Sequence, residues 1–282
     1  MGIQFNRVSH AYKGLKTQYR ALKDISLQIE KEGEFVAICG HTGSGKSTLV
    51  QHMNALLLPT EGEAIVFDQK LPPKKGEKIN FLRQKVGLVF QFPEYQLFEE
   101  TILKDIMFGP KNFKDTEKEA EEKAKRAASI VGIDESLYEK SPFRISGGQM
   151  RRVAVAGILA MEPAILVLDE PTRGLDPKGR NDFMNIFKQI HEEQNKSIVI
   201  ITHDMDLIAE YAKRVIVLNE GKVVYDGKKE DLFKHENFVS FHLELPTPLR
   251  IIKYLEQKLN KTLPPQYDYA SLLKQLQEEK HE

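Results

Sequence analysis

Hydrophobic runs alternate with amphipathic stretches along the second half of this chain. Uninterrupted apolar runs end in polar residues at 164–169, 197–202 and 214–219, a pattern typical of strands that are buried on both faces of a sheet. Helical spacing fills the intervals, near 181–195 and again from about residue 204. Alternating strands and helices of this kind predict an α/β fold built on a parallel sheet.

The first half of the chain is richer in strands. We predict short strands over 3–12, 21–30, 34–39, 63–69 and 85–91. The earliest of them predict an antiparallel β subdomain beside the parallel sheet. A glycine-rich segment follows the third strand and introduces a helix at 46–57, which ends before Pro59.

From about residue 93 to residue 160 the chain becomes helical, which predicts a helical subdomain. Its stretch 116–132 places Glu ahead of Lys and Arg at spacings that suit a solvated helix face. We expect the main domain to span residues 3–227 and a small helical extension to follow over 228–282.

The extension carries its own helix signals. Thr247 and Pro248 predict an N-cap and the first turn of one helix. After a Pro-Pro pair, residues 271–280 predict a final helix.

The composition narrows the classes of function. The chain has 282 residues, 41% of them hydrophobic, and equal totals of 41 basic and 41 acidic residues. Zero net charge argues against a general nucleic-acid binder. The one cysteine, Cys39, closes a predicted strand, where we expect a small buried side chain rather than a redox group. No signal segment opens the chain and no apolar run reaches the roughly 18 residues of a bilayer span, so we expect a cytosolic chain that reaches a membrane through a partner.

The strongest chemical signal is the segment from Gly40 to Ser47. It matches the P-loop pattern G-x-x-x-x-G-K-[ST] between a predicted strand and a predicted helix, where backbone N–H groups point at phosphate oxygens. Lys46 should reach the β- and γ-phosphates, and the Ser47 hydroxyl should bind Mg²⁺. His41 is expected to contribute its backbone more than its ring. The predicted nucleotide-binding residues here are Gly40, His41, Thr42, Gly43, Ser44, Gly45, Lys46, Ser47 and Thr48.

Two acidic residues, Asp169 and Glu170, end one of the apolar runs. Adjacent carboxylates at a strand end are often solvated turn residues, but the P-loop upstream changes that expectation. Asp169 then fits a Walker B residue that holds Mg²⁺ through water. Glu170 fits the general base that polarises the attacking water.

Two further strands end in polar side chains. His203 follows the run at 197–202, and Gln91 ends the strand at 85–91. Ligands of parallel sheets bind outside the carboxyl ends of the strands, so we predict that His203 senses the γ-phosphate. Gln91 would respond either to Mg²⁺ or to the attacking water.

A second phosphate-binding helix start is predicted at Ser146, Gly147, Gly148 and Gln149. Ser146 is a plausible N-cap. Two consecutive glycines at a helix start are costly unless a backbone or a ligand must approach closely. Because the P-loop already supplies one such site, the second suggests that two chains share the nucleotide.

Together these motifs resemble the ATPase subunits of ABC transporters over residues 3–227. The resemblance implies ATP and Mg²⁺ as cofactors and a head-to-tail dimer that clamps each ATP between one P-loop and the partner's Ser-Gly-Gly-Gln. It also implies that Asp176 belongs to a D-loop at the dimer seam, which is compatible with an N-cap role. Tyr12 would stack on adenine, although an ordinary strand tyrosine remains an alternative. Arg173 stands where a small residue is common, and no contact is predicted for it.

Several segments are similar to the ATPases of energy-coupling factor (ECF) transporters, closest to the second ATPase of the pair, the A′ component. They include GHTGSGKSTL, SGGQMRRVAVAGILAMEP and the helical extension. This resemblance implies a second ECF ATPase as partner, as a heterodimer or a homodimer, on the cytoplasmic face of the cell membrane. A membrane-embedded T component would dock on Phe92 to Pro110, and a substrate-binding S component would select a vitamin or a transition-metal ion.

Within the docking segment, four acidic residues are candidate partners for basic tips of the T component, or else form a solvated surface. They are Glu94, Glu99, Glu100 and Asp105. The extension would hold the ATPase dimer together through apolar residues such as Ile251, Leu255 and Leu272, or would only pack on the surface.

Other classes fit less well. A conventional ABC importer ATPase is the nearest alternative. ABC ATPases of DNA repair carry a long coiled coil between Gln91 and Ser146, where this chain has about 54 residues, and ribosomal ones carry two ABC domains in one chain. A P-loop kinase would need neither the Ser-Gly-Gly-Gln segment nor His203.

Overall fold

The computed structural model describes residues 1–13 and 18–279. Its centre is a six-stranded sheet of order β10-β9-β3-β8-β7-β6, parallel except for β10. Its strands are β3 (Phe35–Cys39), β6 (Val86–Val89), β7 (Ile165–Asp169), β8 (Ser197–Ile201), β9 (Arg214–Asn219) and β10 (Lys222–Lys228). The predicted α/β fold with a parallel sheet is therefore confirmed.

The register of the central strands brings their carboxyl ends to one level. Ile201 of β8 pairs with Ile38 of β3 on one side and with Asp169 of β7 on the other. The residues that follow these three strands therefore meet at one edge of the sheet.

Successive residues of β3 face two different cores, as the alternation of a strand requires. Phe35, Ala37 and Cys39 belong to the larger core, whereas Val36 and Ile38 belong to the smaller one. The thiol of Cys39 is fully buried. Burial disfavours the thiolate and raises the pKa of Cys39 to about 12, which fits the expected role as a small buried side chain.

A second, antiparallel sheet of order β2-β1-β4-β5 packs beneath the first, as predicted. Its strands are β1 (Ile3–Lys13), β2 (Gln18–Ile29), β4 (Glu61–Val66) and β5 (Gln69–Leu71). Apolar side chains of β1 and β4, including Ile3, Phe5 and Val66, share the smaller core with Leu49 of helix α1 (Lys46–Met53). This sheet therefore supports the helix that follows the P-loop.

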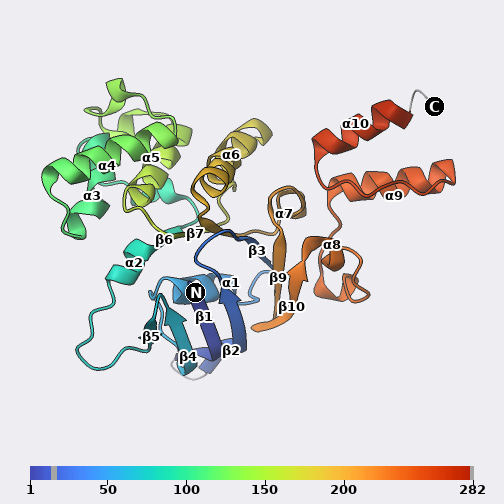
Figure 1. The fold of residues 1–282 in the computed structure, drawn as a ribbon, viewed down its shortest axis with the longest axis horizontal. Helices are drawn as coiled ribbons and strands as arrows, with labels where there is room; N and C mark the ends of the chain where they lie inside the picture. Colours follow the sequence, from blue (N-terminus) through green and yellow to red (C-terminus); the bar gives the residue numbers. More distant parts are fainter. Residues whose placement is uncertain (14–17, 280–282) are drawn as a thin grey trace.

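Further helices lie between α1 and the C-terminal region (Figure 1). They are α2 (Phe81–Lys85), α3 (Ile102–Asn112), α4 (Glu117–Ile130), α5 (Gly147–Leu159), α6 (Pro177–Gln194) and α7 (Met205–Tyr211). Helix α4 is amphipathic: it buries an alanine face that includes Ala120 and Ala124, and a capping box of Thr116 and Glu119 starts it. Helices α3, α4 and α5 pack together at one end of the molecule.

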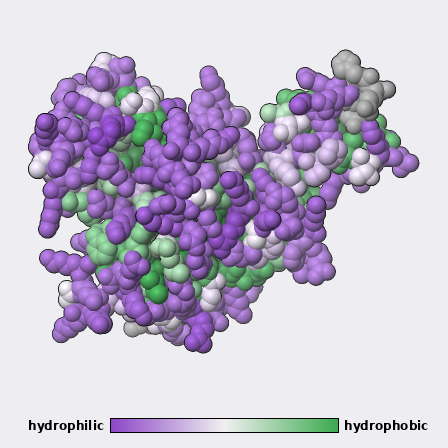
Figure 2. Space-filling model, in the orientation of Figure 1, coloured by the Kyte–Doolittle hydropathy of each residue, from purple (hydrophilic) through white to green (hydrophobic). Residues whose placement is uncertain are grey.

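The C-terminal region contains α8 (Lys229–Leu232), α9 (Thr247–Leu259) and α10 (Tyr269–Glu279). Helices α9 and α10 project away from the sheets (Figure 1) and enclose a small core of Ile252, Leu263 and Leu272. On the face shown in Figure 2, hydrophilic residues cover most of the surface and hydrophobic residues form a few limited patches. No helix in the described ranges is long and apolar enough to cross a membrane.

Several element boundaries differ from the predictions. Helix α1 ends at Met53 rather than near residue 57, because the chain turns at Ala55, whose φ is 58°. Helix α6 begins at Pro177, earlier than predicted. The N-cap of α9 is Pro246, so the prediction of Thr247 as the cap is wrong; the backbone N–H of Thr247 donates to Asp206 instead. Helix α2 and strand β10 were not predicted.

Candidate functional site

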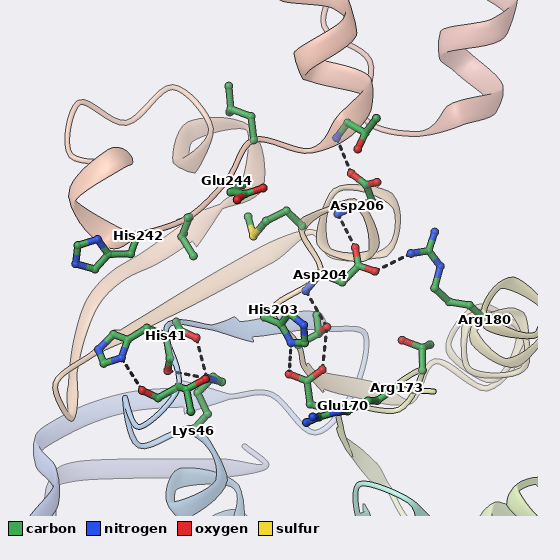
Figure 3. Close-up of a pocket in the computed structure, with 18 of the residues that line it drawn as sticks. His41, Lys46, Glu170, Arg173, Arg180, His203, Asp204, Asp206, His242 and Glu244 are labelled. Carbon is green, nitrogen blue, oxygen red and sulfur yellow. Dashed lines mark hydrogen bonds and ion pairs between the residues drawn. The ribbon is translucent and has the colours of Figure 1, made fainter. Parts of the chain in front are cut away.

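A cleft of about 900 Å³ lies at the carboxyl ends of β3, β7 and β8 (Figure 3). Gly40, Lys46, Glu170 and His203 line it, each from a segment that directly follows one of these strands. The far wall comes from the C-terminal region, which contributes Thr247 among others. The cleft therefore lies where ligands of open parallel sheets bind.

Two glycines of the P-loop are required by close backbone contacts. Gly40 has φ 140° and Gly45 has φ 105°. A Cβ atom would stand 2.1 Å from the Leu218 carbonyl oxygen at the first position and 2.5 Å from the Ala21 carbonyl oxygen at the second. Only glycine fits both conformations, so the loop is bent tightly between β9 and β2 before it enters α1.

Lys46 is held over the loop that precedes it. Its Nζ donates to the carbonyl oxygens of Gly40, at 2.7 Å, and His41, at 3.0 Å. Burial lowers the pKa of Lys46, while the negative charges of Glu170 and Asp169 oppose that shift. The ammonium group therefore bonds to the loop and interacts electrostatically with both carboxylates.

The His41 ring has a contact that was not predicted. Its Nε2 lies 3.0 Å from the side-chain oxygen of Asn219, and its Nδ1 lies 2.7 Å from the Thr42 carbonyl oxygen. The ring therefore ties the tip of the loop to the end of β9. The Ser44 hydroxyl is fully buried beneath the loop and has no hydrogen-bond partner within the described residues.

Asp169 and Ser47 form an oxygen-rich pair beside the loop. Burial and the neighbouring Glu170 charge raise the pKa of Asp169, and a hydrogen bond from Ser47 together with the Lys46 charge opposes the rise. A carboxylate and a hydroxyl are the hard oxygen ligands that Mg²⁺ prefers. No group of three or more metal-binding side chains (His, Cys, Asp or Glu) occurs in the described part of the chain.

Glu170 has an unusual backbone and two polar neighbours. Its φ of 48° lies in the left-handed region, a strain that is common at functional sites. One carboxylate oxygen lies 2.8 Å from Nδ1 of His203, and the other accepts from the Thr202 hydroxyl at 3.5 Å. The Glu170 side chain is 16% exposed and that of His203 is 73% exposed. The pair thus points a carboxylate and an imidazole into the cleft (Figure 3).

Gln91 does not line the cleft. Its neighbour is Arg173, a residue for which the sequence predicted no contact. Because a guanidinium group has only donors, the amide oxygen of Gln91 faces it and accepts from Nη1 at 2.6 Å and from Nε at 3.2 Å. Arg173 itself does line the cleft.

The Ser-Gly-Gly-Gln segment lies outside the cleft. Ser146 and Gln149 form a capping box at the start of α5, and the segment is largely exposed to solvent. A Cβ atom at Gly147 or Gly148 would meet nothing within 4 Å in this chain. Neither glycine is therefore required by a contact within the described chain.

Asp176 and Tyr12 also lie outside the cleft. Asp176 caps α6 by accepting from the backbone N–H of Gly179 at 2.8 Å. The hydroxyl of Tyr12 lies 3.2 Å from that of Thr48 on α1, and its ring is 42% exposed and edge-on to His10.

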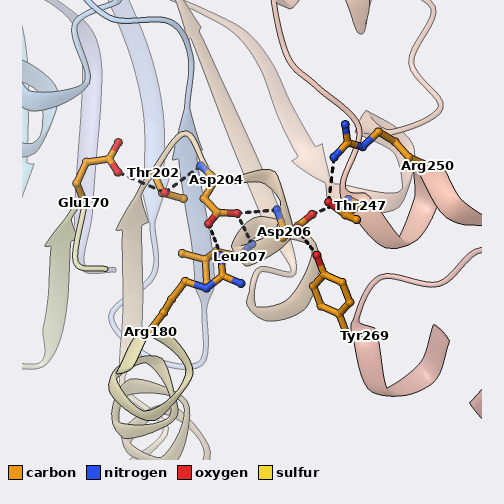
Figure 4. A network of polar contacts seen from close by, with 9 residues as sticks. All are labelled: Glu170, Arg180, Thr202, Asp204, Asp206, Leu207, Thr247, Arg250 and Tyr269. Carbon is orange, nitrogen blue, oxygen red and sulfur yellow. Dashed lines mark hydrogen bonds and ion pairs between the residues drawn. The ribbon is translucent and has the colours of Figure 1, made fainter. Parts of the chain in front are cut away.

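A polar network that was not predicted holds α7, the helix after His203 (Figure 4). Asp204 caps this helix and pairs with Arg180 of α6 at 2.7 Å. Asp206 accepts from the Thr247 backbone N–H at 2.6 Å and from the Tyr269 hydroxyl at 2.7 Å. The C-terminal region is therefore bound directly to the helix that follows the cleft. No sequence rule pairs residues so far apart in the chain.

The family model of the ABC transporter matches residues 22–173, and these residues include the P-loop, Ser-Gly-Gly-Gln and the acidic pair. The chain belongs to the ABC transporter ATPases and is an ATPase. It is 52% identical to the energy-coupling factor transporter ATP-binding protein EcfA2 of Ligilactobacillus salivarius, over 87% of this chain and 86% of that one. A protein of the same name from Bacillus cereus is 47% identical over 94% and 91%. Within the ABC family, this chain is therefore an ATPase of the energy-coupling factor type.

Solved structures agree with this assignment. A dimer of the ATP-binding cassette MJ0796 in a post-hydrolysis state, bound to ADP and Pi, matches with a TM-score of 0.71 at 33% identity. The match covers 80% of this chain and 98% of that one. CbiO1 from Clostridium perfringens, part of the ABC transporter complex cbiONQ, matches with a TM-score of 0.73 at 36% identity, over 90% and 98%.

Proposed function

We propose that this chain is the ATP-hydrolysing motor subunit of an ECF-type importer, with the cleft at the ends of β3, β7 and β8 as its catalytic site. The observation that carries the proposal is the convergence of Lys46, the Asp169–Glu170 pair and His203 at one sheet edge. A P-loop alone would support nucleotide binding. The carboxylate in contact with an imidazole beside it supports hydrolysis.

Each side chain then has a chemical role. The loop N–H groups and Lys46 would bind the phosphates. Ser47 directly and Asp169 through water would hold Mg²⁺, which would neutralise charge on the phosphate oxygens. Glu170 accepts a proton from the attacking water, and His203 orients the Glu170 carboxylate and contacts the γ-phosphate. Gln91 would act on Mg²⁺ or on the water once it leaves Arg173.

A second ATPase subunit would complete the site. The open space above Gly147 and Gly148 supports approach by the partner's nucleotide, with Ser146 and Gln149 at the same helix start. Asp176 would lie at the seam between the subunits, and Tyr12 would stack on adenine. A heterodimer with a second ECF ATPase is our preferred assembly, and a homodimer is the alternative.

The segment from Phe92 to Pro110 would receive the membrane-embedded T component. It exposes Tyr95, Phe98 and Phe108, and the rings of the last two pack edge to face at 4.8 Å. Exposed aromatic residues are typical of binding surfaces.

Three of the four candidate acidic residues in this segment have partners within the chain. Glu94 pairs with Arg151, and Asp105 accepts from the backbone N–H groups of Phe98 and Glu99. Glu99 and Glu100 remain the better partners for basic tips of the T component, with Glu100 also paired to Lys104 on the surface.

The resemblance to the same family also supports a proposal for the remaining subunits. An S component would select the cargo, a vitamin or a transition-metal ion, and the motor would sit on the cytoplasmic face of the membrane. We assign residues 3–227 to the ATPase domain, with its helical subdomain at about 93–160. Residues 228–282 would help to hold the two ATPases together, which an apolar groove lined by Phe238, Leu249 and Leu263 supports.

Substitution Glu170→Gln tests the proposed function. The amide keeps the shape of the side chain but cannot accept a proton at neutral pH, so turnover should fall at least about 100-fold while ATP binding persists. Steady-state hydrolysis and equilibrium binding of ATP with Mg²⁺ measure the two effects. Glu122→Gln, an exposed change on α4, is the control and should leave both unchanged. Near-normal hydrolysis by Glu170→Gln would show that Glu170 is not the base.

A further inference from the structure

Arg173 blocks the one atom of Gln91 that is able to bind a cation. A side-chain amide offers its oxygen, with two lone pairs, to metals and to water protons, whereas its NH₂ group only donates. Nη1 and Nε of Arg173 both donate to this oxygen, at 2.6 Å and 3.2 Å. The oxygen is thus fully used, and a guanidinium charge stands where a metal ion would approach.

The fold supports this contact, because a buried arginine ties together the two segments that carry Gln91 and Arg173. Arg151 of α5 has a side chain that is 5% exposed and pairs in a two-pronged manner with Glu94, at 2.9 Å and 3.0 Å. The same guanidinium donates to the backbone oxygen of Arg173 at 3.0 Å. Glu94 lies three residues after Gln91, so Arg151 anchors the segment that carries Gln91 and contacts the backbone of Arg173 directly.

Phe92 also packs against Arg151 and against the turn that follows β7. The residue has φ 54°, and its ring lies over the Arg151 guanidinium at 5.9 Å. On the other side the Phe92 ring approaches Gly174, where an added Cβ would be 3.6 Å away. The segment after β6 and the turn after β7 are therefore locked together next to the contact.

We propose that Arg173 is a positioning residue that holds the amide oxygen of Gln91 away from the bound metal–nucleotide. Gln91 serves the reaction only after this contact opens. The contact thus competes with metal binding, and its loss raises the affinity of the site for the divalent cation. This inference rests on the proposed function, because that function assigns Gln91 to Mg²⁺ or to the attacking water.

The test measures metal binding rather than hydrolysis. Full-length protein carrying Glu170→Gln is titrated with Mn²⁺ in the presence of ATP, and free Mn²⁺ is followed by its electron paramagnetic resonance signal. Adding Arg173→Ser should lower the Mn²⁺ concentration at half-saturation about three- to tenfold, the effect expected when this charge-assisted contact is lost at an exposed site. Arg173→Lys, which keeps the charge but not the two-pronged geometry, should lie between. Arg83→Ser removes an equal charge from exposed α2 and should change nothing.

A double-mutant cycle assigns the effect to Gln91. In a Gln91→Ala background, Arg173→Ser should no longer raise Mn²⁺ affinity. Unchanged or weaker Mn²⁺ binding by Arg173→Ser, or a gain that persists without Gln91, would overturn the proposal. Failure of the Glu170→Gln protein to bind ATP with Mn²⁺ at all would instead overturn the proposed function, and the proposal with it.

Discussion

Negative charge is concentrated at the carboxyl end of β7, where Asp169 and Glu170 are adjacent and both are largely shielded from solvent. Lys46 is the cation that interacts with both. Two carboxylates and one ammonium group leave an excess of negative charge at this site, and a divalent cation is the natural complement. Because the site contains both carboxylates and an ammonium group, its charge changes at the acidic end and at the alkaline end of the pH range.

Removal of the Glu170 charge should move the pH range of metal–ATP binding. Glu170 raises the pKa of Asp169 and also raises the pKa of Lys46. Glu170→Gln removes both effects, so the pKa of each group falls. Asp169 then stays ionised to lower pH and Lys46 loses its proton at lower pH, which shifts both limbs of the binding profile toward acid.

This shift is measured by ATP binding with Mg²⁺ across pH for the wild-type and Glu170→Gln proteins. Glu122→Gln serves as the control for loss of a distant carboxylate. Limbs that stay in place, or that move apart, would contradict the electrostatic account of Asp169 and Lys46.

For individual residues, the sequence predicted the site position of those that belong to a motif and missed the contacts of those that do not. Gly40, Lys46, Glu170 and His203 line one cleft, as the rule on strand ends requires. Gln91 obeys the same rule by position, yet its amide faces Arg173. The direction of a side chain depends on neighbours that no spacing in the sequence reveals.

Helix α5 joins three parts of the molecule through Arg151. Its guanidinium contacts Glu94 after β6 and the backbone oxygen of Arg173 after β7, while the same helix begins with Ser146 and the two open glycines. A movement of α5 would therefore reach both strand ends. The proposed partner site and the proposed catalytic site are connected by one helix.

Substitution Glu94→Ala should loosen this connection. Arg151 would be left buried without its carboxylate, a loss that costs about 3–5 kcal/mol in typical cases. Burial tends to raise the pKa of Glu94, but the bonds from Arg151 outweigh it and lower the pKa. The stabilisation is therefore present above the unfolded-state pKa and is lost as pH falls through the folded-state pKa.

Chemical denaturation at neutral pH measures the loss in unfolding free energy. Glu94→Gln, which keeps an acceptor for Arg151, should lose less. The neighbouring Glu100→Ala removes an exposed carboxylate paired only at the surface, so its unfolding free energy should stay close to that of the wild-type protein. Equal stability of Glu94→Ala and Glu100→Ala would contradict the account.

The C-terminal region belongs to the site as well as to the proposed dimer contact. Thr247 lines the cleft, and Asp206 joins α7 to both Thr247 and Tyr269 (Figure 4). The sequence predicted that this region is helical but not that it borders the catalytic cleft. Such contacts between residues 41 and 63 positions apart depend on the whole fold.

Substitution Tyr269→Phe should release α10 from α7. The hydroxyl donates to the Asp206 carboxylate at 2.7 Å, and Tyr269 is 41% exposed, so its loss should cost about 1 kcal/mol. Hydrogen exchange of the α10 amides should then accelerate about fivefold. Tyr254→Phe on α9, an exposed tyrosine whose ring centroid lies 5.7 Å from the Lys258 ammonium, is the matched control. Exchange at wild-type rates would show that the hydroxyl does not fasten the helix.

Complete burial of Cys39 makes this molecule convenient for labelling. The chain has one cysteine, fully buried, and burial raises its thiol pKa to about 12, so near neutral pH it offers almost no thiolate that could attack a maleimide reagent. Fluorophores can therefore be attached at chosen surface positions without first removing the native thiol. Cysteines introduced at exposed Phe143 and Val239 would report, by energy transfer between subunits, how the assembled motor closes during one catalytic cycle.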